Sequence, residues 1–354
     1  MALSIGIVGL PNVGKSTLFT ALTSKGGLAA NYPFATIEPN IGIVPVPDAR
    51  LQVLADIVHP GRIVPATVEF VDIAGLVRGA NAGEGLGNQF LANIRETDAI
   101  VEVVRYFSDA DVVHVEGSAD PKRDSETIRT ELILADLGTV ERALPRLMKE
   151  AKRGAAEAAG LAAVERLQKW LNEGRRAFDF EAREEERPTL RDLHLLSAKP
   201  LLYVANVDED AAATRAEPIG EVEPIVISAK VESEIAEMSP EEAIEYLTML
   251  GLESSGLERL AQAAYQLLGL HSFFTAGEME VRAWTIPLGA KAPQAAGVIH
   301  TDFERGFIKA ETASYADYVE YGGEAGCRAV GRLRQEGKEY VVQDGDVMHF
   351  KFNV

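Results

Sequence analysis

Residues 9–16 (GLPNVGKS) place two glycines, a lysine and a serine in the spacing G-x-x-x-x-G-K-[ST]. Glycine lets such a loop wrap closely around phosphate, so that main-chain N–H groups face the anionic oxygens. Lys15 would supply a positive charge to the β- and γ-phosphates, and the Ser16 hydroxyl would ligate Mg²⁺. The nucleotide-binding residues predicted in this segment are Asn12, Val13, Gly14, Lys15, Ser16 and Thr17.

A second motif, D-x-x-G, occupies residues 72–75 at the end of an apolar run. A carboxylate at Asp72 can hold Mg²⁺ through water, and the N–H of Gly75 can sense a γ-phosphate. This motif is weak alone, but its position after a phosphate loop makes it informative. Asp72 is therefore predicted as a metal-site residue.

The base-reading motif departs from the GTPase pattern Asn-Lys-x-Asp. Residues 206–209 read N-V-D-E, so that Val207 and Glu209 stand where lysine and aspartate would lie. The aspartate of a GTPase accepts hydrogen bonds from guanine N1–H and N2–H₂, which adenine does not offer, so the change favours adenine. The alternative is that Glu209 reaches one methylene further and still binds guanine. The residues predicted around the base are Asn206, Val207, Glu209, Ser228 and Ala229.

The water-orienting residue of many GTPases has no counterpart here. Leu76 follows the D-x-x-G motif, where a glutamine would orient the attacking water. Hydrolysis is then either slow or dependent on another group. Arg78 could act as an arginine finger or be a solvated loop residue, and the glycine-rich run 79–87 suits a switch segment.

Short apolar runs are the elements that would position these motifs. They lie at residues 5–9, 68–72, 100–104, 201–206 and 224–228, and helical stretches separate them. This pattern predicts an α/β domain with a parallel sheet and helices on both faces.

Two segments have a different spacing of apolar residues. Residues 126–199 carry apolar residues at helical spacing, with a proposed turn at 154–160, which predicts an inserted helical hairpin or coiled coil. The insertion also explains why Asn206 follows Asp72 by 134 positions, where two βαβ passages need only about 60. Alternating runs at 281–286, 339–342 and 347–352 predict a small mixed-sheet domain. The expected domains are 1–125 with 200–268 for nucleotide binding, 126–199 for the insertion and 269–354 for the C-terminal domain.

Composition narrows the class of protein. The formal net charge is −19 over 354 residues, which argues against coating nucleic acid by charge alone. The lone cysteine, Cys327, cannot form an internal disulfide, and a reducing cytoplasm is expected. No apolar run approaches the roughly 20 residues that span a membrane, so no membrane partner is expected. The N-terminal residues are expected to form a strand and not a signal peptide.

Residues 9–18, 72–77 and 206–209, together with residues 31–40 (NYPFATIEPN), resemble the signatures of the YchF-type Obg-like ATPases within the Obg-related P-loop GTPases of the TRAFAC class. The resemblance spans the whole chain and implies preference for ATP, association with ribosomes or their large subunit, and a β-grasp TGS domain at the C-terminus. It implies that Thr36 closes on Mg²⁺ and that His114 replaces the missing glutamine as the catalytic group. Contact with RNA through the TGS domain or the hairpin tip is also implied.

Some alternatives remain at this level. Asn12 either resembles the phosphate-loop asparagine of K⁺-dependent relatives or simply caps its loop. Lys149, Lys152 and Arg153, near the expected hairpin tip, form either a ribosome contact or a solvated helix end. The chain is expected to be a Mg²⁺-dependent, slowly hydrolysing ATP switch. A GTPase of ordinary Obg type and a scaffold that binds nucleotide without hydrolysis are the competing hypotheses.

Overall fold

The structure is a computed structural model that describes residues 3–25, 40–73, 86–108 and 120–353. Contacts divide the chain into two compact units. The first unit contains Met1–Ile43 and Glu69–Arg259, and the second contains Val44–Val68 and Leu260–Val354. Each unit has its own six-stranded sheet and is described by itself.

The sheet of the first unit has the strand order β2-β4-β1-β5-β6-β7. Its central strands, β1 and β5, are almost fully buried, as their largely apolar sequences predict. The pairs β1–β4, β1–β5, β5–β6 and β6–β7 are all parallel. The strands are β1 (Ser4–Val8), β2 (Ile41–Pro45), β4 (Thr67–Asp72), β5 (Ala99–Arg105), β6 (Leu201–Asn206) and β7 (Ile225–Ile227). The predicted parallel α/β sheet is confirmed.

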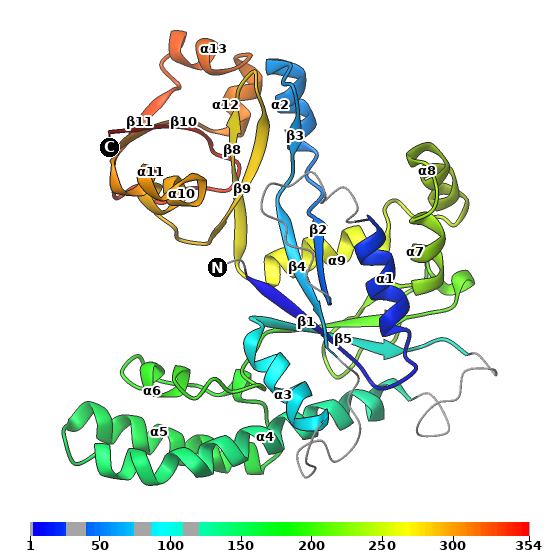
Figure 1. The fold of residues 1–354 in the computed structure, drawn as a ribbon, viewed down its shortest axis with the longest axis vertical. Helices are drawn as coiled ribbons and strands as arrows, with labels where there is room; N and C mark the ends of the chain where they lie inside the picture. Colours follow the sequence, from blue (N-terminus) through cyan, green and yellow to red (C-terminus); the bar gives the residue numbers. More distant parts are fainter. Residues whose placement is uncertain (1–2, 26–39, 74–85, 109–119, 354) are drawn as a thin grey trace. The chain divides into compact units, whose positions relative to one another are not determined.

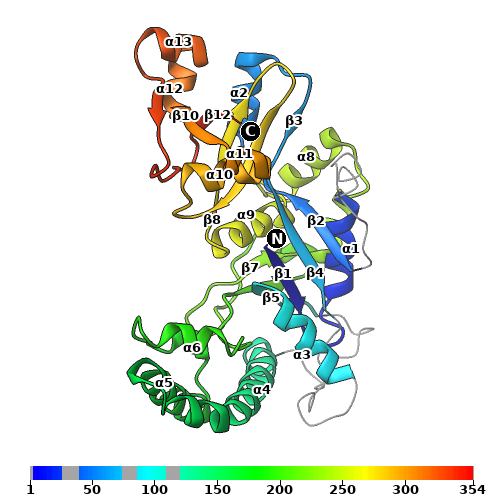
Figure 2. The same ribbon diagram turned by 60° about the vertical axis from the view of Figure 1, so that its left-hand side comes forward.

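Helices connect these strands, as Figures 1 and 2 show. The longer ones are α1 (Lys15–Lys25), α3 (Leu86–Glu96), α4 (Pro121–Glu150) and α5 (Ala155–Asn172). After the last strand of this sheet come α8 (Pro240–Met249) and α9 (Gly256–Leu267), which continues into the second unit. Short helices are α6 (Arg187–Arg191) and α7 (Ala229–Ile235), with single 3₁₀ turns η2 (Ala177–Asp179) and η3 (Glu209–Ala211). Helix α1, which follows the phosphate loop, packs against α7.

The insertion is a helical hairpin. Helix α4 begins at a cap in which the Asp120 carboxylate accepts a hydrogen bond from the N–H of Arg123, with proline at the first helical position. Helices α4 and α5 run side by side (Figures 1 and 2) and share an apolar core. The chain reverses between Glu150 and Ala155, so the expected turn at 154–160 was placed too late: Gly154 caps α5 and Gly160 lies inside it.

The second unit has the strand order β11-β10-β12-β8-β9-β3. Its strands are β3 (Ile63–Val64), β8 (Leu270–Ala276), β9 (Val281–Pro287), β10 (Phe307–Ala313), β11 (Arg334–Glu336) and β12 (Val347–Phe352). Its helices are α2 (Arg50–Val58), α10 (Ala292–Ile299), α11 (Thr301–Arg305), α12 (Tyr315–Glu320) and α13 (Glu324–Ala329). Strand β12 lies parallel to β8 and antiparallel to β10, with α10 following the β8–β9 hairpin. This is the β-grasp arrangement.

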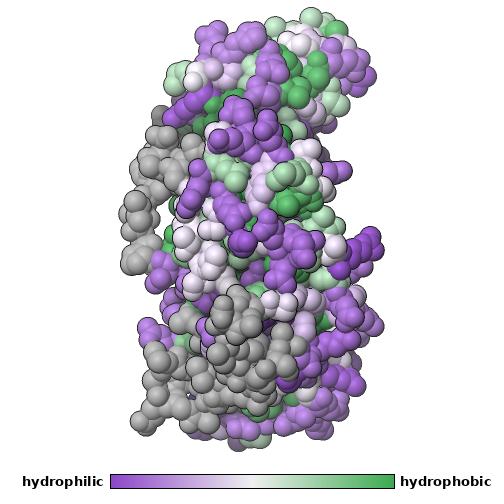
Figure 3. Space-filling view, turned by 90° about the vertical axis from the view of Figure 1, so that its right-hand side faces the viewer, coloured by the Kyte–Doolittle hydropathy of each residue, from purple (hydrophilic) through white to green (hydrophobic). Residues whose placement is uncertain are grey.

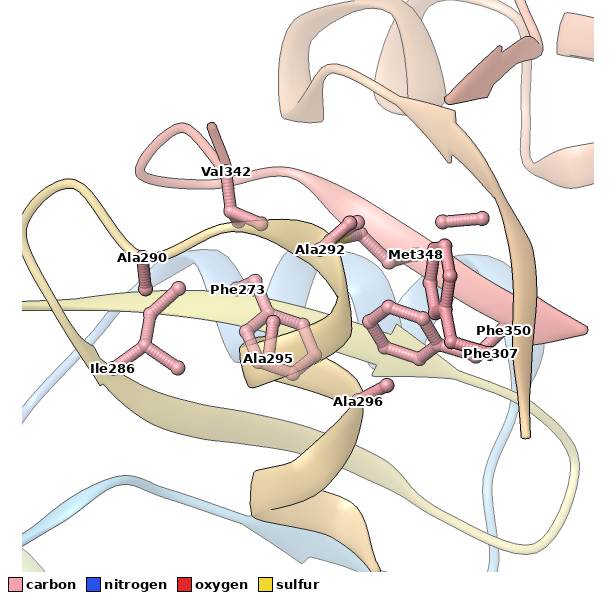
Figure 4. Packing of buried hydrophobic residues seen from close by; sticks show 11 residues of the cluster. Phe273, Ile286, Ala290, Ala292, Ala295, Ala296, Phe307, Val342, Met348 and Phe350 are labelled. Atoms are coloured by element: carbon pink, nitrogen blue, oxygen red, sulfur yellow. The ribbon is translucent and has the colours of Figure 1, made fainter. Parts of the chain in front are cut away.

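Helix α10 and the sheet of this unit share one apolar core, drawn in Figure 4. Phe273, fully buried, lies between the stacked ring of Trp284 and the edge of the Phe350 ring. The buried residues of α10 are the small Ala292, Ala295 and Ala296, which let the helix approach the sheet closely.

The division of the chain differs from the sequence-based domains at residues 44–68. Strand β3 pairs in parallel with β9, and the Arg50 guanidinium forms an ion pair of 2.8 Å with Asp344. These contacts group Val44–Val68 with the C-terminal unit, although the sequence placed the segment in the nucleotide domain. A two-residue strand is too short to show periodicity. The alternating run 339–342 was also misread, because it forms only an isolated bridge between Val341 and Lys291.

In the face drawn in Figure 3, hydrophilic residues predominate and hydrophobic residues form small separate groups among them. Among the described residues, no helix combines the length and the apolar character needed to cross a membrane.

Candidate nucleotide site

The phosphate loop connects β1 to α1 and needs its glycines for close packing. A Cβ on Gly9 would lie 2.8 Å from the carbonyl oxygen of Val103 in the neighbouring strand. Gly14 has a φ of +89°, and a Cβ there would lie only 2.1 Å from the side-chain nitrogen of Asn206. Asn12 also has a positive φ, 64°, which asparagine tolerates better than most residues. The loop therefore has the backbone conformation that the glycine spacing predicted.

The sheet brings the four motif segments to one edge. Strands β1, β4, β6 and β7 all run parallel, so the phosphate loop, Asp72, Asn206 and Ser228 follow the same ends of their strands. They surround an open cavity of about 1560 Å³. The cavity lining includes Asn12, Gly14, Lys15, Ser16, Thr17, Asp72, Asn206, Val207, Glu209, Ser228 and Ala229. Of the described residues predicted for the site, Val13 does not line it, because its side chain is buried in the core.

Lys15 and Asp72 lie in direct contact at one end of this cavity. The Lys15 ammonium donates to Oδ1 of Asp72, and the lysine is 9% exposed. Ser16, the next residue, is exposed at the start of α1. A hydroxyl and a carboxylate are the hard oxygen ligands that Mg²⁺ prefers, so these two residues fit the expected metal. A triphosphate with Mg²⁺ would give each member of the ion pair a new partner, the phosphate for Lys15 and the cation for Asp72.

Asn206 holds three segments together. Its Nδ2 donates 2.8 Å to the carbonyl oxygen of Val13, and its Oδ1 accepts 3.0 Å from the N–H of Ala229. Val207 is 7% exposed and donates its N–H to the carbonyl oxygen of Ile227, so the base motif is anchored in the sheet. Ser228 caps α7 through the N–H of Val231. Asn206 and Ser228 are thus held through their side chains, and Val207 through its backbone.

Glu209 is held by residues from two helices. Its Oε2 accepts a hydrogen bond of 2.9 Å from the Lys230 ammonium at the start of α7, and its Oε1 accepts one of 3.0 Å from the Tyr246 hydroxyl on α8. The hydrogen bond from Lys230 lowers the pKa of Glu209, and the same bond raises the pKa of Lys230. The Tyr246 hydroxyl also lies 2.6 Å from Oε2 of Glu234, and this hydrogen bond raises the pKa of the phenol.

Sequence reasoning missed several residues of the site. Lys230 directly follows the predicted Ser228 and Ala229 but was not predicted as a site residue, and Tyr246 lies 37 positions from Glu209 with no motif around it. Asp208 also contributes, since its Oδ2 accepts 3.1 Å from the N–H of Ser108 after β5. The one available signal for α8 was the capping box formed by Ser239 and Glu242, which marks where that helix begins.

Several residues named from the sequence lie outside the described residues. They are Thr36, Gly75, Leu76, Arg78 and His114, with most of the segments 31–40 and 79–87. Their roles remain predictions from the motif order and the family resemblance.

The sequence of this chain is similar to proteins of one family. A family model described as 50S ribosome-binding GTPase matches residues 4–153. A second model, YchF-GTPase_C, described as a protein of unknown function, matches residues 270–353. The proteins named "Ribosome-binding ATPase YchF" from Pasteurella multocida (strain Pm70) and Bacillus subtilis (strain 168) are each 54% identical to this chain, over the full length of both partners.

A solved structure agrees with these matches. The structure titled as the Schizosaccharomyces pombe YchF GTPase is 41% identical, with a TM-score of 0.88, and the match covers 99% of this chain and 97% of that chain. The likeness therefore includes the phosphate-loop domain, the helical insertion and the C-terminal domain. The chain belongs to the YchF family, whose α/β fold carries a P-loop GTPase-type domain.

Proposed function

We propose that this protein binds and slowly hydrolyses ATP in preference to GTP, with Mg²⁺, and acts as a switch that associates with ribosomes. The main support is that Val207 and Glu209 line the same cavity as the phosphate loop. They occupy the motif positions at which a GTPase has the lysine and the aspartate that bind guanine. The printed names of the relatives differ on the base, since two are called ATPases and the solved structure is titled a GTPase. Base preference therefore has to be argued from the site.

The chemistry of the two bases supports adenine. Guanine presents N1–H and N2–H₂ as two donors, whereas adenine N1 is an acceptor and adenine has no N2 amine. In a site that binds guanine, a carboxylate that accepts from both donors strengthens binding, because a buried donor without a partner costs free energy. Glu209 is one methylene longer than the aspartate that serves this purpose, and its two oxygens already accept hydrogen bonds from Lys230 and Tyr246.

Mg²⁺ would be held by Ser16 and Asp72, and Thr36 is proposed as a third ligand. The bound metal would neutralise charge on the phosphates. Lys15 would orient the β- and γ-phosphates, and the N–H groups of the phosphate loop would bind their oxygens. Leu76 cannot orient water, which supports slow hydrolysis, and His114 is proposed as the catalytic group. A requirement for K⁺, suggested by Asn12, is part of the same proposal.

Ribosome association rests on the relatives' names and on the hairpin tip. Lys149, Lys152 and Arg153 are all exposed at the α4–α5 turn. We propose contact with the ribosome, including its RNA, through this tip or the C-terminal domain, in the cytoplasm. Cosedimentation with ribosomes tests this proposal. Neutralising the three cations and deleting residues 271–354 should each weaken it, and unchanged cosedimentation in both variants would place the contact elsewhere.

The base preference can be tested by restoring the GTPase motif. Glu209→Asp should move the ratio of GTP to ATP affinity toward GTP, because the shorter carboxylate cannot keep both hydrogen bonds to Lys230 and Tyr246. Adding Val207→Lys should move it further. The buried Val207 packs with Ala205 and Val226, so the double variant also needs a stability measurement. An unchanged ratio in a folded Glu209→Asp variant would show that the length of this side chain does not set the base preference.

A GTPase of Obg type and a scaffold without hydrolysis remain the competing functions. Titration with ATP and GTP separates the proposed ATPase from the GTPase. A single-turnover hydrolysis assay with ribosomes separates it from the scaffold.

A further inference from the structure

Glu209, Lys230, Glu234 and Tyr246 form a cluster at the base-binding end of the cavity, which we name the Glu209 clamp. Lys230 and Tyr246 each engage a different oxygen of the Glu209 carboxylate, at 2.9 and 3.0 Å. Glu209, Lys230 and Glu234 line the cavity, and Tyr246, on α8, contacts both Glu209 and Glu234. Each oxygen of the Glu209 side chain, which has three rotatable bonds, thus lies within hydrogen-bond distance of a donor.

Fold stability is a weak explanation for this cluster. Lys230 and Glu209 have side chains that are 69% and 37% exposed, and ion pairs in such positions contribute little to folding. The Tyr246 hydroxyl has a single proton, and Glu234 at 2.6 Å competes with Glu209 for it. The contacts of Lys230 and Tyr246 with the two carboxylates therefore contribute little to the free energy of folding.

We propose that Lys230 and Tyr246 are positioning residues that hold the Glu209 carboxylate away from the guanine-reading orientation, and thereby discriminate against GTP. Guanine would need both carboxylate oxygens turned toward its N1–H and N2–H₂ donors. That turn breaks the charge-assisted hydrogen bond from Lys230 and the hydrogen bond from Tyr246. Adenine binding does not require Glu209 to turn, so only GTP loses binding free energy. Specificity then comes from an unfavourable interaction with the competing nucleotide. This inference rests on the proposed preference for ATP and names the residues that enforce it.

The test is equilibrium titration of the full-length protein with ATP and with GTP in the presence of Mg²⁺. The variants are Tyr246→Phe, Lys230→Met and the double substitution, and the readout is the ratio of the two dissociation constants. In the double variant the preference for ATP over GTP should fall about tenfold, because Glu209 is then free to turn. A general loss of pocket shape would weaken both nucleotides together and leave the ratio unchanged.

The Glu209→Gln background supplies the matched control. Glutamine has one acceptor oxygen and an amide that would oppose the guanine donors, so releasing it gains nothing for GTP. Tyr246→Phe and Lys230→Met should therefore leave the ratio unchanged in that background. Far-UV circular dichroism establishes that each variant is folded, and two substitutions on different helices keep the test independent of either one.

The outcomes distinguish failure of the Glu209 clamp from failure of the proposed function. If the unaltered protein prefers ATP and the clamp variants leave the ratio unchanged, the clamp is wrong and the proposed function stands. A ratio that changes equally with Glu209→Gln present, or a change that favours ATP further, also overturns the clamp. If the unaltered protein prefers GTP, the proposed function itself fails.

Discussion

The side-chain amide of Asn206 donates a hydrogen bond of 2.8 Å to the carbonyl oxygen of Val13, joining the end of β6 to the phosphate loop. The Oδ1 atom of the same amide accepts a hydrogen bond from the N–H of Ala229, so one buried side chain links the phosphate-binding and base-binding segments. The shape of the phosphate loop thus depends on a residue from the base-reading motif.

Asn206→Ala should weaken ATP and GTP binding by a similar factor. It leaves a buried carbonyl and a buried N–H without their partner and should lower the free energy of unfolding by about 1–3 kcal/mol. Titration with both nucleotides and urea unfolding measure the two effects. Asn172→Ala is the control, because Asn172 is exposed on α5 and bonds only within its own helix. A selective loss of one nucleotide would contradict this role of Asn206.

Gly14→Ala should abolish nucleotide binding beyond its effect on stability. The new Cβ would meet the Asn206 amide at 2.1 Å and displace either that side chain or the loop. Gly220→Ala is a matched control, since Gly220 also has a positive φ, +62°, but has open space around it. Both substitutions carry the left-handed penalty of about 1–2 kcal/mol, so unfolding should shift in both. Equal nucleotide binding in the two variants would refute the proposed packing.

Glu102 predicts a pH dependence of stability. It is 2% exposed in β5, and Oε1 has no hydrogen-bond partner among the described residues. Burial raises the pKa of Glu102 well above its usual value, against the opposing charge of Arg176 and with a further increase from Asp124. The folded protein therefore keeps this proton after the unfolded chain has lost its own. The resulting stability is present below about pH 4.3 and is lost as the pH rises toward the folded pKa.

Glu102→Gln should remove this dependence, because glutamine does not titrate. Compared with the variant, the unaltered protein should lose about 1.4 kcal/mol per pH unit between the pKa of the unfolded chain and the raised pKa of Glu102 in the folded protein. Urea unfolding at pH 5, 6 and 7 measures the difference, with the exposed Glu165→Gln as control. A difference between the two proteins that stays constant with pH would show that Glu102 does not titrate as proposed.

His114→Ala should lower the turnover of ATP at least about tenfold while leaving ATP affinity nearly unchanged. A positioned acid–base group contributes about 10²–10⁴-fold, and Leu76 supplies none. Single-turnover hydrolysis and equilibrium binding separate the two quantities. His300→Ala, an exposed histidine of the C-terminal unit, is the control. Normal turnover in His114→Ala would return attention to Arg78, to K⁺ or to a partner.

The sequence predicted those parts of the site that depend on local spacing. The phosphate loop, Asp72 and the base motif follow the ends of apolar strands, and parallel strands bring such ends to one edge of a sheet. Lys230 and Tyr246 could not be predicted as partners of Glu209, because that contact depends on how α7 and α8 pack. The pairing of Ile63 with Val281 was missed for a related reason, since it joins a two-residue strand to one more than 200 positions away.

The proposed function depends on a preference of this nucleotide site for adenine. Isothermal titration of the purified full-length protein with ATP and with GTP, each with Mg²⁺ under the same conditions, tests it most directly. We expect a lower dissociation constant for ATP than for GTP. A dissociation constant for GTP equal to or lower than that for ATP would contradict it.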